Sequence, residues 1–238
     1  MAFTMKITLR TILSSALFLN GLGGLRAQIV WSFTDGTGAP SATVANLSGG
    51  VLSAGNLAGT SSLAFNITSA STNSGASGGN NAAVRTVASA SLSPSSSTYF
   101  EFTVTPANGY QISATGLTLG SRSAGTGPTT LSLFSSVDSF SSALGSIVTS
   151  TNSTWTSVTL SSFSVAAAAN TPVTFRLYGA PSGTTTSANW RVDDLSFSAS
   201  AISAIPEPST YAALAGAAAL GGAAWRRRRR PRSPDPRV

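Results

Sequence analysis

The sequence of 238 residues contains no cysteine and no histidine. These absences exclude a Ser-His-Asp or Cys-His nucleophile, zinc sites of the usual ligand types and any disulfide framework. The only lysine is Lys6, near the N-terminus, so the rest of the chain has no candidate for Schiff-base or Ser-Lys chemistry. Carboxylate chemistry and the binding of hard cations by oxygen ligands remain open.

Charge is also scarce, because charged residues make up 9% of the chain against about 25% in average soluble domains. The formal net charge of +7 comes from the two ends of the sequence. Between Gln28 and Ile205, four arginines stand against five acids, and 4 − 5 leaves −1. The arginines of this central part are Arg85, Arg122, Arg176 and Arg191, and its acids are Asp35, Glu101, Asp138, Asp193 and Asp194. A central part without net positive charge argues against nucleic acid as a partner.

The central part, residues 28–204, is predicted to be an all-β domain. Ser (42), Thr (29) and Gly (23) are abundant, yet 42% of the chain is hydrophobic, which favours a folded domain over disorder. Several windows alternate apolar and polar residues with the period of a strand, separated by turn residues. They are 29–34, 83–88, 99–105, 110–119, 130–134, 155–160, 173–178 and 190–197. We expect a β-sandwich of jelly-roll-like form, with a long loop over 69–81 and a β-helix as the alternative.

The last of these windows has an irregular alternation. Trp190 and Val192 share one parity and Leu195 shares the other with Phe197, so burying all four requires a β-bulge at Asp193-Asp194. Endings of this kind resemble the final strand of carbohydrate-binding jelly rolls. The two aspartates are candidate ligands of Ca²⁺, the one cofactor that the sequence suggests, because hard cations prefer carboxylate and backbone oxygens. The alternative is that they cap loop amides or pair with Arg191 or Arg176.

Two further sets of side chains are candidates for saccharide chemistry. Trp31, Trp155 and Trp190 would stack on sugar rings if they were exposed, and would otherwise fill the core. The acids Glu101, Asp138, Asp193 and Asp194 are the available members of a glycosidase pair, although their spacing does not favour one.

Residues 1–27 are predicted to form a secretory signal peptide. Lys6 and Arg10 precede a short apolar run, and small residues lead to Ala27, after which cleavage is expected. This signal helix would export the domain. The pair Met5-Lys6 is itself typical of a signal-peptide start, so Met5 is an alternative first residue.

Residues 205–238 have three parts in order. They are Pro206-Glu207-Pro208, an apolar segment over 210–225, and the five consecutive arginines Arg226, Arg227, Arg228, Arg229 and Arg230. The 16-residue apolar segment would make a helix of about 24 Å against a hydrocarbon core of about 30 Å. We predict a transmembrane helix, with the arginines in the cytoplasm by the positive-inside rule.

This tail resembles the PEP-CTERM sorting signal of Gram-negative bacteria. The resemblance implies export, transient residence in the inner membrane as a single-pass precursor, cleavage near the PEP motif by an exosortase, and release to the cell surface. The resemblance also implies an association with extracellular polysaccharide and biofilm material. Two other interpretations of the tail are a plain membrane anchor and a nucleic-acid-binding arginine patch.

Three functions follow as hypotheses. The first is a non-enzymatic exported surface or matrix protein, whose partners are exosortase, the secretion machinery and extracellular polysaccharide. The second is a carbohydrate-binding module or adhesin of the bacterial surface. The third is a glycosidase that uses carboxylates.

Overall fold

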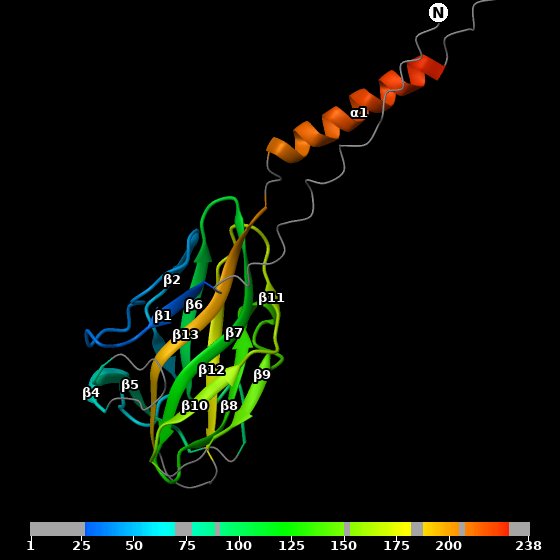
Figure 1. Ribbon diagram of the computed structural model, residues 1–238. Helices are drawn as coiled ribbons and strands as arrows, with labels where there is room; N and C mark the ends of the chain where they lie inside the picture. The colour runs from blue at the N-terminus through cyan, green and yellow to red at the C-terminus, as the bar shows by residue number, and fades with distance from the viewer. Residues whose placement is uncertain are drawn as a thin grey trace, which may run out of the picture.

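The computed structural model of the chain describes residues 27–69, 78–88, 91–149, 153–181, 188–204 and 208–228. Its body consists of two antiparallel sheets that lie as the two layers of a sandwich (Figure 1). The predicted all-β, jelly-roll-like sandwich is confirmed, and the β-helix alternative is wrong. The predicted signal peptide covers residues 1–27. Only its last residue, Ala27, lies within the described ranges.

One layer, sheet A, holds seven strands in the order β10-β7-β13-β5-β4, with β1 beside β13 and β11 beside β7. The strands are β1 (Gln28–Trp31), β4 (Ala64–Thr68), β5 (Asn80–Arg85), β7 (Tyr110–Ser123), β10 (Thr156–Leu160), β11 (Val165–Ala166) and β13 (Asn189–Ser203). Strand β13 runs through the middle of the sheet, where β7 lies on one side and β5 and β1 lie on the other.

The other layer, sheet B, has six strands in the order β2-β6-β12-β8-β9, with β3 beside β6. They are β2 (Leu47–Gly49), β3 (Ser53–Gly55), β6 (Tyr99–Pro106), β8 (Pro128–Ser135), β9 (Gly145–Val148) and β12 (Val173–Pro181). A single 3₁₀ turn, η1 (Ser136–Asp138), follows β8 in the described part of the chain.

All eight predicted strands are present, with shifted ends. Strand β1 stops at Trp31, because Phe33 takes a left-handed conformation with φ of 56° that a strand cannot continue through. Strand β5 begins at Asn80, so the end of the expected loop over 69–81 belongs to a strand. Residues 70–77 of that loop lie outside the described ranges.

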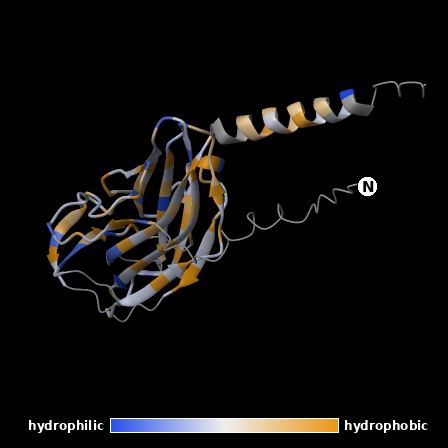
Figure 2. Cartoon of the chain, turned by 45° about the horizontal axis from the view of Figure 1, so that its top comes forward, coloured by the Kyte–Doolittle hydropathy of each residue, from blue (hydrophilic) through white to orange (hydrophobic). Residues whose placement is uncertain are grey.

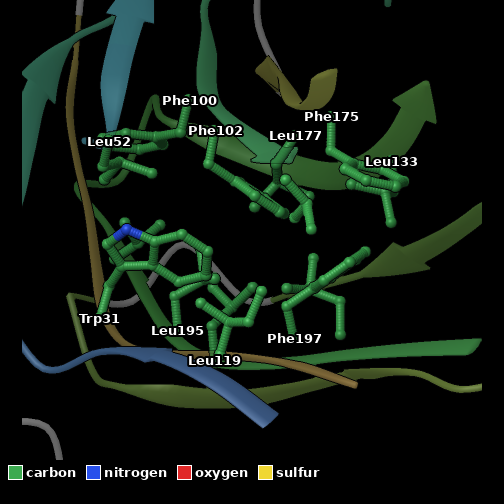
Figure 3. Packing of buried hydrophobic residues seen from close by; sticks show 14 of the residues in the cluster. Trp31, Leu52, Phe100, Phe102, Leu119, Leu133, Phe175, Leu177, Leu195 and Phe197 are labelled. Atoms are coloured by element: carbon green, nitrogen blue, oxygen red, sulfur yellow. The ribbon is translucent and has the colours of Figure 1, made fainter. Parts of the chain in front are cut away.

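The core lies between the two sheets and follows from the period of two. In β6, Phe100, Phe102 and Val104 are buried while the residues between them point outward. Figure 3 shows Phe102 and Phe175 of sheet B facing Phe197 of sheet A across the interior. The ring centroids are 5.5 Å apart for Phe102 and Phe175 and 4.5 Å apart for Phe175 and Phe197. Apolar burial of this kind is the main stabilising contribution to such a sandwich.

The predicted β-bulge in the last strand is confirmed. Along β13 the register with β7 passes from Asp193 opposite Gly120 to Ser196 opposite Thr118, which leaves one extra residue on β13. Asp194 has φ of 46°, a left-handed conformation that Asp tolerates better than most residues. The bulge reverses the parity of the strand, so the four apolar residues around it, Trp190, Val192, Leu195 and Phe197, are all 0% exposed.

Helix α1 (Pro208–Arg228) follows the last strand and lies outside the two sheets (Figure 1). Pro208 begins the helix, where its missing N–H costs no hydrogen bond. In Figure 2 the helix is coloured mainly in pale shades, whereas several strands carry strongly hydrophobic residues. Within the described ranges, no helix combines the length and apolar character that a membrane crossing needs. The predicted helix is therefore found, whereas the predicted transmembrane span is not found among the described residues.

Candidate functional site

Two of the three candidate tryptophans belong to the core. Trp31 and Trp190 are both 0% exposed. The Trp31 indole N–H donates to the Gly50 carbonyl at 3.0 Å, and that of Trp190 donates to the Ser121 hydroxyl at 3.1 Å. Since the interior of the sandwich covers both rings, neither can stack on a sugar, and the sugar-binding prediction is wrong for these two residues.

Trp155 is the candidate that the structure leaves partly accessible. It immediately precedes the edge strand β10 and is half-buried. Because Val158 and Leu160 point into the core, the alternation places Trp155 on the outer face of sheet A. Thr156 lies opposite Ser121, so Trp155 falls beside Arg122 on the neighbouring strand. Sugar stacking by Trp155 stays a prediction.

The aspartate pair forms the bulge and does not gather further acids. Asp193 is 1% exposed, and its Oδ1 accepts the N–H of Asp194 at 2.9 Å. Among the described residues there is no group of three or more acidic side chains that could hold a metal ion. The contact between Asp193 and Asp194 matches the alternative of a capped loop amide, and Ca²⁺ binding at this pair stays a prediction.

The remaining glycosidase candidates do not form a pair with the bulge aspartates. Glu101 lies on the outer face of sheet B, where its Oε2 accepts a hydrogen bond from Arg176 Nε at 2.6 Å. Asp193 lies on the outer face of sheet A, so the core separates the two carboxylates. Asp138 accepts hydrogen bonds from Ser141 and Ser142. Its pKa is below the ordinary value, because these hydrogen bonds outweigh desolvation, which is the largest single effect and acts in the opposite direction.

Arginine residues on sheet A form a site that the sequence alone did not indicate. Arg191 of β13 lies directly opposite Arg122 of β7 in the ladder, on the outer face. A pocket of about 110 Å³ opens between them, and it is lined by Arg122, Ser123, Ala124, Ser153, Asn189 and Arg191. We call it the arginine pocket. The sequence shows which face each arginine takes, but only the register of β7 against β13 brings the two together.

The sorting tail is only partly described. Of the predicted sorting residues, Pro206 and Glu207 lie outside the described ranges, and Pro208 starts α1. Of the predicted cytoplasmic anchor, Arg226, Arg227 and Arg228 form the last residues of α1, and Arg226 is exposed. Arg229 and Arg230 lie outside the described ranges.

Residues 204–229 match the PEP-CTERM protein-sorting motif. This match covers the PEP residues and all but the last of the five arginines. The tail is a PEP-CTERM sorting motif. A PEP-CTERM motif implies an exported protein that an exosortase recognises and processes. No curated protein matches the chain.

Several solved structures are similar to part of this chain. The chain is 17% identical to an arabinose-bound GH51 α-L-arabinofuranosidase, with a TM-score of 0.36 over 74% of this chain and 27% of the other. It therefore spans about a quarter of that enzyme. The K3 adhesin domain of Lys-gingipain from Porphyromonas gingivalis W83 is 17% identical, with a TM-score of 0.34 over 72% of this chain and 97% of the other. A family 11 carbohydrate-binding module from Clostridium thermocellum is 12% identical, with a TM-score of 0.31 over 73% and 96%. Likenesses at these scores carry no functional argument.

Proposed function

We propose that the protein is a non-enzymatic surface or extracellular-matrix protein of a Gram-negative bacterium. The observation that carries the proposal is the sorting motif at 204–229, which implies export and processing by an exosortase. The body supports it through its surface chemistry. Its four arginines and five acids give it a formal net charge of 4 − 5 = −1. Its outer face on sheet A carries hydroxyls such as those of Thr118, Ser157 and Ser198. A surface of this kind suits many weak hydrogen bonds to hydrated polysaccharide.

The test of the proposal is replacement of the sorting motif. Changing Pro206, Glu207 and Pro208 to alanine should accumulate full-length protein in the cells and remove the processed form from the surface fraction. The chain contains a matched control, Pro234-Asp235-Pro236, with the same chemistry beyond the arginines. Alanine at these three positions should leave processing intact. Normal release of the first variant, measured by immunoblotting of cell and medium fractions, would contradict exosortase sorting.

A carbohydrate-binding module or adhesin is the second candidate, because Trp155 is a partly accessible aromatic ring on the outer face of sheet A. A glycan array probed with the full-length protein tests this candidate. Binding that Trp155→Ala removes would support it, and binding that survives the substitution would exclude Trp155 as the sugar platform.

A further inference from the structure

The arginine pocket places two positive charges side by side, and among the described residues neither arginine forms an ion pair with a carboxylate. Arg122 and Arg191 are direct partners in the antiparallel ladder, and like charges in that position destabilise a sheet. Burial, and secondly the charge of Arg122, lower the pKa of Arg191. In the described part of the chain, the ion pair that the structure shows is Arg176 with Glu101, on sheet B. The fold thus carries an unfavourable contact at this point.

Arg122 is held in position by neutral acceptors. Its Nε donates to the carbonyl of Ser153 at 2.6 Å, and one terminal nitrogen donates to the hydroxyl of Ser69 at 2.7 Å. These bonds orient the planar guanidinium without cancelling its charge. Ser153 itself is tied to β7, because its N–H donates to the carbonyl of Ser123 at 3.2 Å. The pocket wall is therefore ordered before any ligand arrives, which reduces the cost of binding.

The size of the pocket limits what it can take. Its volume of about 110 Å³ is well below the ~300–1,000 Å³ of sites that enclose a drug-sized ligand. It has room for one small group, while the rest of a larger ligand would lie across the open face of sheet A. Asn189 adds an exposed amide to the lining, and Trp155 lies on the same face next to Arg122.

We propose that the arginine pocket binds the carboxylate of a uronic acid residue in an acidic polysaccharide, with Trp155 as the adjacent stacking surface. This inference deepens the proposed function and rests on it for the presence of the polymer. A guanidinium presents its N–H donors as a flat fork that matches the two oxygens of a carboxylate. The bound carboxylate would place its negative charge between Arg122 and Arg191 and relieve their repulsion. The polymer would make its other contacts with the hydroxyls of the sheet.

Binding of an oligogalacturonate to the purified full-length protein, measured by isothermal titration calorimetry, tests the proposal. Cellohexaose serves as the neutral arm and a heparin-derived hexasaccharide as the sulfated arm. We expect saturable binding of the oligogalacturonate, weakened about tenfold or more by Arg191→Gln, because a hydrogen bond to a charged group is lost. Arg191→Lys should bind with intermediate affinity, since it keeps the charge but loses the fork.

Arg85→Gln is the matched control. Arg85 is exposed on β5, opposite Asn189, and does not line the pocket. Its replacement removes the same charge from the same sheet and should leave the affinity within about twofold at physiological salt. Arg191→Gln should also melt at the same temperature as the parent or higher, because it removes a repulsion. A lower melting temperature would give Arg191 a merely structural role and overturn the proposal.

Three other results would overturn the proposal. They are no saturable binding of the oligogalacturonate, an equal loss in Arg85→Gln and Arg191→Gln, or tighter Arg191-dependent binding of the sulfated arm. The failure of this inference is separable from failure of the proposed function, because binding is measured on purified protein and sorting in cells. Normal sorting without binding of the oligogalacturonate would contradict only the inference about the arginine pocket. Binding of the oligogalacturonate together with normal release of the variant that lacks the PEP residues would contradict only the sorting proposal.

Discussion

Trp31 allows the strongest test of how the sandwich is built. The change Trp31→Ala removes a ring that is 0% exposed and that packs against Phe102 at 4.9 Å between centroids. It also removes the donor that the Gly50 carbonyl uses at 3.0 Å. The same residue was a candidate sugar platform by sequence, and in that role its loss would leave stability nearly unchanged.

The expected cost follows from the burial. Removing a fully buried Trp side chain costs about 3–5 kcal/mol, and a partly buried carbonyl left without its donor adds about 1 kcal/mol. Against a typical total stability of about 5–15 kcal/mol, this is a large share. For a domain of this size, about 1 kcal/mol corresponds to ~2–4 °C, so the melting temperature should fall by about 10 °C or more.

Trp155→Ala is the matched control, because Trp155 is the half-buried tryptophan at the edge of sheet A. It should cost about 1 kcal/mol, or ~2–4 °C. Trp31→Phe, which keeps an aromatic ring but loses the N–H donor, should lie between the two. Differential scanning calorimetry and urea unfolding measure all three variants. Two results would refute the assignment of Trp31 to the core. One is a fall in melting temperature of less than about 3 °C for Trp31→Ala. The other is a fall for Trp155→Ala that exceeds the fall for Trp31→Ala.

Two further predictions concern the bulge and the pH dependence. Deleting Asp194 removes the extra residue of β13 and turns Leu195 and Phe197 toward solvent, at about 1.5–3 kcal/mol each. Urea unfolding should show that loss, and an unchanged midpoint would contradict the role of the bulge. Hydrogen bonds from the backbone and then the side chain of Thr37 hold the pKa of Asp35 below its ordinary value of 3.8. The stability it contributes is present above that value and disappears as the pH falls through the lower folded pKa. The difference in stability between the parent and Asp35→Asn should therefore shrink on acidification from pH 5, whereas a constant difference would contradict the hydrogen-bonded carboxylate.

The sequence could predict the bulge in β13 but not the one in β7. Around Asp193 the apolar residues are large and their change of parity is plain, so only an added residue could bury them all. In β7 the same change occurs between Ala114 and Leu117, where the register shifts opposite Ser198 and Ala199. Small residues such as Ala114 and Gly116 hide that change, because they carry little hydrophobic signal.

The alternation of apolar and polar residues could not predict the short strands either. Strands such as β2 and β3 have three residues each, and β9 has four. A period of two is not recognisable over so few residues. These strands form because longer neighbouring strands have backbone N–H and C=O groups available for pairing. The pairing of β3 with β6, for example, uses the N–H and C=O groups on one side of β6.

The sequence by itself determined the sorting tail, the all-β character of the body and the parity of its longer strands. These properties depend on composition, on motif order and on local alternation, all of which are written along the chain. Only the tertiary structure decided that Trp31 and Trp190 fill the core while Trp155 stays half-buried, and that Arg122 meets Arg191. Alternation assigns a side chain to a face, but the choice of neighbouring strand and its register depend on packing between segments far apart in the sequence.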